Sequence, residues 1–207
     1  MKTYRIHLIR HGMTEGNQKG LYIGRTDLPV TTDGINTLRQ LRTAYVYPAA
    51  ALFYSSPMLR CRQTLEVVYP DAAYTIVPGL VECDFGEFEG KTAAELENDP
   101  DFAAFLAGTG SPRGGEDTPS FLQRSVVAFH QTVKDVLTKG ETDAVICTHG
   151  GVIMAIMAAV CLERREFYEW SCGNGEGYTL RITPGLCMRS GVAEPAGLIP
   201  YERADGK

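Results

Sequence analysis

The sequence predicts an α/β fold built on a mostly parallel sheet. Strand patterns and helix patterns alternate along the chain, which is typical of βαβ units. Two buried-strand patterns, Tyr4–Arg10 and Ala144–Thr148, also run directly into His11-Gly12 and His149-Gly150. Because ligands bind beyond the carboxyl ends of parallel strands, we expect both imidazoles to lie at one edge of this sheet.

The first half of the chain contains three strand patterns. A helix begins after the cap candidates Thr31, Thr32 and Asp33 and carries Leu38, Leu41 and Tyr45 at helical spacing. The remaining elements are a strand at Ala50–Ser55, a helix carrying Leu59, Leu65 and Val68, and a short strand at Thr75–Val77.

The second half predicts a long helix and two more strands. Thr118 caps the helix, and Pro119 lies in its first turn. Its buried stripe consists of Leu122, Val126, Phe129, Val133 and Val136. After the strand Ala144–Thr148 come a buried helix around 152–157 and a late strand, Gly177–Thr183, at the sheet edge. We predict no element for residues 185–207.

Residues 82–115 differ from the rest because they are rich in Gly, Asp and Glu, with short helical pieces at Ala93–Glu97 and Phe102–Leu106. We predict that this segment folds over the strand ends as a lid or substrate pocket. The 207 residues suffice for one core, so we expect a single domain over 1–207.

Composition narrows the function classes. A hydrophobic content of 44% and a charged content of 22% are typical of a soluble globular protein. The net charge of −5 argues against nucleic acid as a partner, although arginines in a cleft can still attract a small phosphorylated metabolite. The sequence shows neither a membrane-spanning run nor a signal peptide. The six cysteines lack metal-site spacing, so we expect reduced thiols and a cytoplasmic protein. A monomer and a homodimer both stay open.

The residues near the strand ends match what phosphoryl chemistry needs. Arginine binds phosphate oxygens with a planar fork, and Arg10 precedes His11. Arg60 and Arg62 follow the second strand, and only one of them can face the strand ends. Glu82 and Asp84 lie at the start of the lid, where partial burial would raise a carboxyl pKa and suit a general acid; a solvated acidic turn is the alternative.

The chain resembles the histidine phosphatase superfamily, also called phosphoglycerate mutase-like. Five stretches match in the family's order, over roughly residues 4–160. They are Arg10-His11-Gly12 with Thr14 and Asn17, the segment 20–24, Ser56 through Arg60 to Thr64, Leu80-Val81-Glu82 with Gly86 and Glu89-Gly90, and Thr148 through Gly151. The resemblance implies a three-layer α/β/α sandwich and a metal-independent phosphatase with no cofactor.

The resemblance also implies the catalytic roles. His11 is similar to the nucleophile that becomes phosphohistidine, and Glu82 to the general acid/base. Arg10, Arg60 and His149 match the phosphate pocket, and His149 adds a third positive charge if a bound anion raises its pKa.

The candidate substrate-binding residues are less specific. They are Asn17, Thr14, Tyr22, Gly24 and Arg25. The sequence does not decide whether Arg62, Arg25 or Arg113 contacts the ligand, and surface charges are the alternative for all three.

Three functions stay open at this point. The first is a phosphomonoesterase, similar to alpha-ribazole phosphatases, acting on a small metabolite. The second is a cofactor-dependent phosphoglycerate mutase, although such enzymes usually carry a longer insertion. The third is a non-catalytic relative that binds a phospho-ligand, which the complete set of catalytic positions disfavours.

Overall fold

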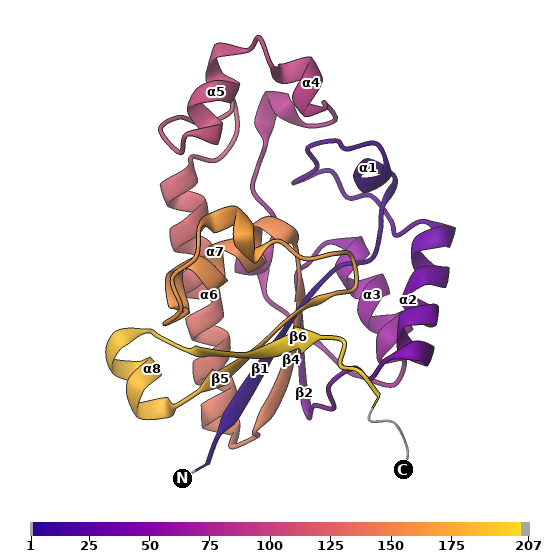
Figure 1. Cartoon of the computed structure of the whole chain (residues 1–207), viewed down its shortest axis with the longest axis vertical. Coiled ribbons are helices and arrows are strands. Elements are labelled where there is room, and N and C mark those ends of the chain that lie inside the picture. Colours follow the sequence, from indigo (N-terminus) through magenta and orange to yellow (C-terminus); the bar gives the residue numbers. More distant parts are fainter. Residues whose placement is uncertain (1, 204–207) are drawn as a thin grey trace.

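A six-stranded sheet forms the centre of the computed structural model, which describes residues 2–203 (Figure 1). The strand order is β3-β2-β4-β1-β5-β6. The strands are β1 (Tyr4–Arg10), β2 (Leu52–Ser55), β3 (Thr75–Ile76), β4 (Asp143–Thr148), β5 (Gly177–Ile182) and β6 (Glu194–Ile199). β1 to β4 pair in parallel, whereas β5 and β6 are antiparallel, so the predicted mostly parallel sheet is confirmed.

Helices cover both faces of the sheet and complete the expected three layers (Figure 1). The α-helices are α1 (Glu15–Gln18), α2 (Thr32–Ala44), α3 (Leu59–Val68), α4 (Ala93–Leu96), α5 (Pro100–Leu106), α6 (Thr118–Lys139), α7 (Gly150–Val160) and α8 (Pro184–Ser190). Three single 3₁₀ turns are η1 (Pro78–Leu80), η2 (Gly86–Phe88) and η3 (Phe167–Trp170). α6 and α7 pack on one face, and α2 and α3 on the other.

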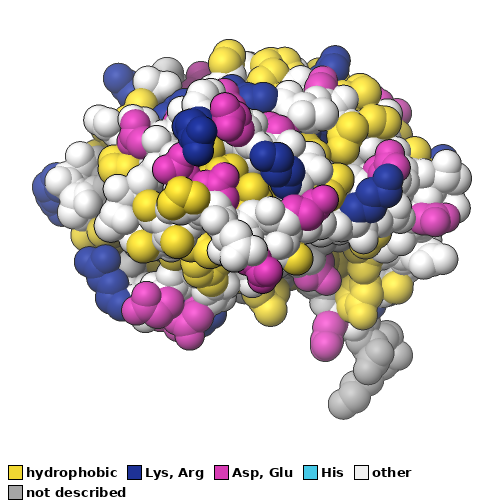
Figure 2. All heavy atoms as spheres, turned by 90° about the horizontal axis from the view of Figure 1, so that it is seen from above, with side chains coloured by type: hydrophobic (Ala, Val, Ile, Leu, Met, Phe, Trp, Pro, Cys, Tyr) yellow, Lys and Arg dark blue, Asp and Glu magenta, His cyan; other side chains and the backbone are white. Residues whose placement is uncertain are grey.

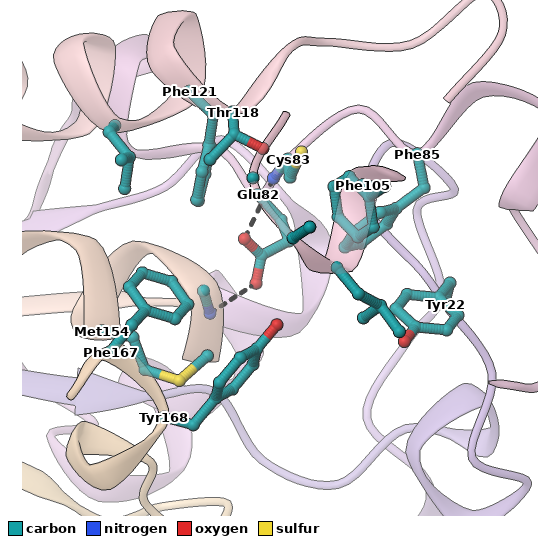
Figure 3. A pocket seen from close by; sticks show the side chains of 15 residues that line it. Tyr22, Glu82, Cys83, Phe85, Phe105, Thr118, Phe121, Met154, Phe167 and Tyr168 are labelled. Carbon is teal, nitrogen blue, oxygen red and sulfur yellow. Dashed lines mark hydrogen bonds between the residues drawn. The ribbon is translucent and has the colours of Figure 1, made fainter. Parts of the chain in front are cut away.

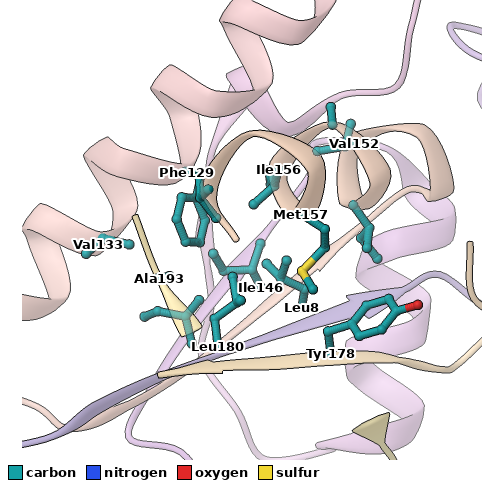
Figure 4. Close-up of a cluster of buried hydrophobic side chains, with 14 of the residues drawn as sticks. Leu8, Phe129, Val133, Ile146, Val152, Ile156, Met157, Tyr178, Leu180 and Ala193 are labelled. Atoms are coloured by element: carbon teal, nitrogen blue, oxygen red, sulfur yellow. The ribbon is translucent and has the colours of Figure 1, made fainter. Parts of the chain in front are cut away.

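The alternation of side chains along β1 divides its apolar residues between two cores. Ile6 and Leu8 belong to the larger core under α6 and α7, together with Phe129 (Figure 4). Ile9 faces the opposite way and packs with Cys61 and Leu65 of α3. Burying one large apolar side chain stabilises the fold by about 1.5–3 kcal/mol. A shift of β1 by one residue would turn each of its apolar side chains to the other face, so burial on both faces fixes its register.

The long helix α6 forms as predicted, and Phe129, Val133 and Val136 are buried as expected, but its cap and the first two residues of its stripe differ. Asp117 is the N-cap, because its Oδ1 accepts a hydrogen bond from the Ser120 N–H at 2.8 Å. Thr118 is therefore already inside the helix. Leu122 and Val126 are only partly buried. The fully buried positions are Phe121, Ser125, Ala128, Phe129, Thr132, Val133 and Val136.

Two C-terminal elements were not predicted from the sequence. β6 lies beyond β5, so β5 is not the edge strand that the sequence suggested. β6 contains a proline and a glycine and exposes three of its six residues, so it shows no strand periodicity. α8 is a seven-residue helix that lies outside the predicted elements. Tyr45, predicted on the apolar face of α2, is instead its exposed C-cap.

The segment 82–115 forms a small unit at the strand ends (Figure 1). It contains η2, α4 and α5, and the two α-helices coincide with the predicted helical pieces within two residues. Phe88, Leu96 and Phe102 form its own small core, against which Tyr22 and Phe105 pack. The segment is therefore held against the loop after β1.

All six cysteines are free thiols, and five of them are buried. None of the helices within residues 2–203 is long and apolar enough to cross a membrane.

Candidate active site

The site lies where β1 and β4 end side by side. Their parallel register pairs Arg10 with Thr148, and the His11 N–H continues the ladder by donating to the Thr148 carbonyl at 2.9 Å. The next residue, His149, is the N-cap of α7. The two imidazole rings therefore meet edge to face, with centroids 5.2 Å apart.

His11 is held as a neutral imidazole. Its Nδ1 lies 2.7 Å from the Gly12 carbonyl oxygen. A carbonyl can only accept, so the ring proton is on Nδ1 and the lone pair is on Nε2. Burial, followed by the positive charges of Arg60 and Arg10, lowers the pKa of His11 to about 3. At neutral pH His11 is therefore uncharged with the Nε2 lone pair available, as a nucleophile requires.

Arg60 is a buried cation fixed by three acceptors. It is 1% exposed, and its guanidinium donates to the carbonyl oxygens of Gly24 and Thr26, both at 2.9 Å. Its Nε donates to Nδ1 of His149 at 3.2 Å. Because a guanidinium carries five N–H donors, two remain beyond these three bonds.

Arg10 is the second cation at the strand ends. Its Nη1 donates to the Cys172 carbonyl at 2.6 Å. Its Nε is buried and finds no hydrogen-bond partner within the described chain. Arg10 also lines the same cavity as His11. A buried donor of this kind indicates an anion-binding position.

His149 is neutral in this arrangement, with both ring nitrogens engaged. Nδ1 accepts from Arg60, so Nε2 carries the proton and donates to Ser56 Oγ at 2.7 Å. The ring is fully buried, and burial with the charge of Arg60 lowers its pKa well below the ordinary value. The third positive charge is expected only with an anion bound, so it stays a prediction. In this structure His149 orients Arg60.

Glu82 is a buried carboxyl held by two backbone N–H groups. Oε1 accepts from Cys83 and Oε2 from Gly151, both at 2.9 Å (Figure 3). Burial raises its pKa, and the two hydrogen bonds and the charges of Arg60 and Arg10 offset only part of that effect. A carboxyl with a raised pKa can carry a proton closer to neutral pH, as general acid catalysis requires.

Two cavities adjoin at Glu82. The smaller, about 180 Å³, is lined by Arg10, His11 and Glu82, and we call it the phosphate pocket. The larger, about 370 Å³, lies between the segment 82–115 and the helices α6 and α7, and we call it the apolar cavity. Tyr22, Glu82, Phe85, Gly151 and Met154 line both.

The comparisons with known proteins agree with this geometry. The model of the histidine phosphatase superfamily (branch 1) matches residues 6–189, which is most of the chain. The chain belongs to this superfamily. The match extends beyond the motifs noted in the sequence and takes in β5 and most of α8.

Relatives of this histidine phosphatase include proteins named as phosphatases and proteins named as phosphoglycerate mutases. An adenosylcobalamin/alpha-ribazole phosphatase of Salmonella typhimurium is 30% identical over 160 residues, which cover 74% of this chain and 78% of that protein. The alpha-ribazole phosphatase of Shigella flexneri has the same fold, with a TM-score of 0.80 at 23% identity over 98% of this chain and 100% of that one. A phosphoglycerate mutase of Thermus thermophilus is 31% identical, with a TM-score of 0.66 over 87% and 93% of the chains.

The structure brings the five predicted catalytic residues together. They are Arg10, His11, Arg60, Glu82 and His149. Three of them line the phosphate pocket. Arg60 and His149 do not line it: the charge of Arg60 acts on His11 and Glu82, and the neutral His149 accepts a hydrogen bond from Arg60.

The candidate substrate-binding residues separate into two groups. Asn17 lines the phosphate pocket, and Tyr22 lines both cavities. Thr14 caps α1 and bonds to the Asn17 side chain, so it supports Asn17 from behind. Gly24 contributes a carbonyl to Arg60, and any Cβ there would meet the Cys83 carbonyl at 1.7 Å. Arg25 is exposed beside Asp84 and Glu116 and lines neither cavity.

The other two arginines in question also lie outside the cavities. Arg113 is an exposed partner of Asp101 at 2.8 Å. Arg62, on α3, lines neither the phosphate pocket nor the apolar cavity. Figure 2 shows positive and negative side chains interspersed on the face above the strand ends, and no histidine is visible there.

The sequence reasoning missed the wall before β5. Asn174 donates from Nδ2 to the His11 carbonyl at 2.9 Å, and Ser171 and Cys172 line the phosphate pocket. Gly173-Asn174-Gly175 indicates only a turn in the sequence. Within residues 2–203, no group of three or more His, Cys, Asp or Glu side chains is arranged to hold a metal ion.

Gly151 leaves room for the Glu82 carboxylate, and this predicts a strong effect of one methyl group. A Cβ at 151 would lie 2.5 Å from Glu82 Oε1, so Gly151→Ala must displace the carboxyl. We expect kcat on an alkyl phosphate to fall by at least about 10-fold, toward the 10²–10⁴-fold that loss of a general acid costs. Gly185→Ala in α8, whose Cβ would meet only Arg189 at 3.7 Å, is the control and should retain full activity. Wild-type kcat in Gly151→Ala would show that activity does not depend on the position of the Glu82 carboxyl.

Proposed function

We propose that this histidine phosphatase hydrolyses phosphomonoesters of small metabolites through a phosphohistidine on His11, with Glu82 as general acid and base. One observation carries the proposal. A neutral His11 with a free Nε2 and a Glu82 with a raised pKa line one pocket beside Arg10. A further buried cation, Arg60, acts on both groups.

In the first step, Nε2 of His11 attacks phosphorus and the P–O bond to the leaving group breaks. Glu82 gives its proton to the leaving oxygen, so the alcohol departs neutral. Arg10 and Arg60 supply fixed positive charge to the transferring phosphoryl group. The bond from Nδ1 to the Gly12 carbonyl keeps the ring oriented throughout.

In the second step, water attacks the phosphohistidine. Glu82, now a carboxylate, takes one proton from that water, and the P–N bond breaks. Inorganic phosphate leaves, and His11 returns to its neutral tautomer. Glu82 ends the cycle with the proton it held at the start.

His149 has a second role in this proposal. Its Nδ1 now accepts from Arg60, but a phosphate dianion in the pocket would raise its pKa. A protonated His149 would release the Arg60 Nε donor and add a third positive charge. The positive charge of Arg60 and His149 would then increase when the anion binds.

Arginine supplies the positive charge in this scheme, so we propose that activity persists in the presence of EDTA. We also propose a cytoplasmic location, which the six free thiols favour. The names of the relatives add alpha-ribazole phosphate and phosphoglycerate to a substrate panel in which orthovanadate serves as competitor.

His11→Ala is predicted to abolish turnover, because the covalent route has no other nucleophile. We expect hydrolysis of p-nitrophenyl phosphate to fall by at least about 10³-fold. Rapid quenching of the wild type in base, followed by mass spectrometry, should find a phosphoryl group on His11. Retained activity, or an adduct on another side chain, would refute the mechanism.

The dependence of kcat/KM on pH is predicted to reflect two groups. Protonation of His11 lowers kcat/KM at acid pH, and deprotonation of Glu82 lowers it as pH rises. The first step needs neutral His11, whose pKa is about 3, so protonation of His11 limits kcat/KM only in strong acid. It also needs protonated Glu82, so kcat/KM falls as pH rises through the elevated pKa of Glu82.

Glu82→Gln is the matched variant for this profile. It should lower kcat/KM on an alkyl phosphate by about 10²–10⁴-fold and remove the alkaline limb. It should affect p-nitrophenyl phosphate far less in the first step, since that leaving group departs without a proton. Comparison on one substrate cancels the titration of the substrate itself. An unchanged alkaline limb in the variant would exclude Glu82 as the acid.

The mutase among the similar solved structures makes isomerisation the second candidate. A mutase must return the phosphoryl group to a bound phosphoglycerate, whose carboxylate needs a cation. We predict that 3-phosphoglycerate, supplied with 2,3-bisphosphoglycerate, is at most hydrolysed. Formation of 2-phosphoglycerate faster than inorganic phosphate, followed by NMR, would favour the mutase.

A further inference from the structure

The apolar cavity begins where the leaving group must be. In the proposed function Glu82 protonates the ester oxygen. Glu82 lines the apolar cavity (Figure 3) and the phosphate pocket alike. The phosphoryl group occupies the side of His11 and Arg10. The rest of the alcohol must therefore extend from Glu82 into the apolar cavity of about 370 Å³.

Aromatic side chains dominate the lining of the apolar cavity. Six of its fifteen lining residues are aromatic, namely Tyr22, Phe85, Phe105, Phe121, Phe167 and Tyr168. They come from the loop after β1, the segment 82–115, α6 and η3, so four separate parts of the chain converge there (Figure 3). Aromatic faces and edges offer favourable contacts to another aromatic ring.

Apolar surface also remains exposed at this cavity. Leu106 is 48% exposed and Tyr168 is 61% exposed, and both line the apolar cavity. Large apolar side chains that stay in contact with water around a concave site mark a ligand-binding surface. A ligand that covers them would gain from the removal of this surface from water.

The charge of the lining excludes a second anionic group. Glu82 is the only charged residue among the fifteen, and none is a lysine or an arginine. A carboxylate or second phosphate on the alcohol would lose its water there without gaining a counter-ion, and it would lie near Glu82. The cavity thus selects against phosphoglycerate-like and bisphosphate substrates.

We propose that the apolar cavity binds the alcohol part of the substrate, and that this part is uncharged and carries an aromatic ring. This inference rests on the proposed function, because it uses Glu82 as the acid at the ester oxygen. It assigns the choice of substrate to the residues of the apolar cavity, whereas Arg10 and His11, with the charge of Arg60, serve the phosphoryl group common to all esters.

A series of primary alkyl phosphates tests the proposal, since their leaving groups have nearly equal basicity. The series is ethyl phosphate, 2-phenylethyl phosphate, 2-(2-naphthyl)ethyl phosphate and 3-phosphoglycerate. We expect kcat/KM to rise by at least about 100-fold from ethyl to naphthylethyl, as burial of that much apolar area implies, and to be lowest for 3-phosphoglycerate.

A charge change at the rim provides the second measurement. Leu106→Lys places a cation beside the apolar cavity. Because Leu106 is half exposed, we expect the substitution to leave the stability of the fold nearly unchanged. It should raise kcat/KM for 3-phosphoglycerate relative to naphthylethyl phosphate by at least about 10-fold. Leu198→Lys, at the exposed position on β6 (66% against 48% for Leu106) and outside both cavities, is the control and should leave this ratio unchanged.

The outcomes separate this inference from the proposed function. If ethyl and naphthylethyl phosphates react equally, or if 3-phosphoglycerate is preferred, while His11→Ala is inactive, the function stands and the inference is overturned. If the wild type hydrolyses no member of the series and no p-nitrophenyl phosphate, both are overturned.

Discussion

The parallel pairing of β1 with β4 is the constraint on which the site depends. It sets Arg10 opposite Thr148, so the residue after each strand is a histidine at the same height. A shift of one residue would carry Ile6, Leu8 and Ile9 to the wrong faces and separate the two rings. The register is held because β1 buries apolar side chains on both faces at once.

Burial beside fixed cations then gives each titratable group its state. His11 is desolvated and lies near Arg60 and Arg10, so it stays neutral, which a nucleophile requires. Glu82 feels the same two cations, which favour its charged form, yet its burial dominates and its pKa rises. One low-dielectric pocket thus produces both an uncharged base nitrogen and a carboxyl suited to proton transfer.

In the proposed function, the two adjoining cavities separate the part of the substrate that reacts from the part that is selected. The phosphate pocket uses charged and polar groups from the strand ends. The apolar cavity uses side chains from the segment 82–115, α6 and η3, which are remote from those ends in the sequence. Glu82 lines both cavities, and in the proposed function it lies where the bond to the leaving group breaks. Change in the lining of the apolar cavity can therefore alter the substrate while the phosphoryl chemistry stays the same.

The sequence by itself determined the alternation of strands and helices and the two strand–histidine junctions, because these are local patterns in one stretch of chain. The choice of Arg60 over Arg62, and of Glu82 as the acid, came from the resemblance to the family. Only the tertiary structure decided which groups serve them. Asn174 reaches His11 from a turn 163 residues away, and burial followed by the charge of Arg60 lowers the pKa of His149 well below its ordinary value. β6 and the contribution of α6 and η3 to the apolar cavity were likewise not predicted. An edge strand with proline and glycine lacks the alternation of apolar and polar residues by which strands are predicted. The hydrophobic pattern of a helix does not distinguish a phenylalanine that faces a core from one that faces a cavity.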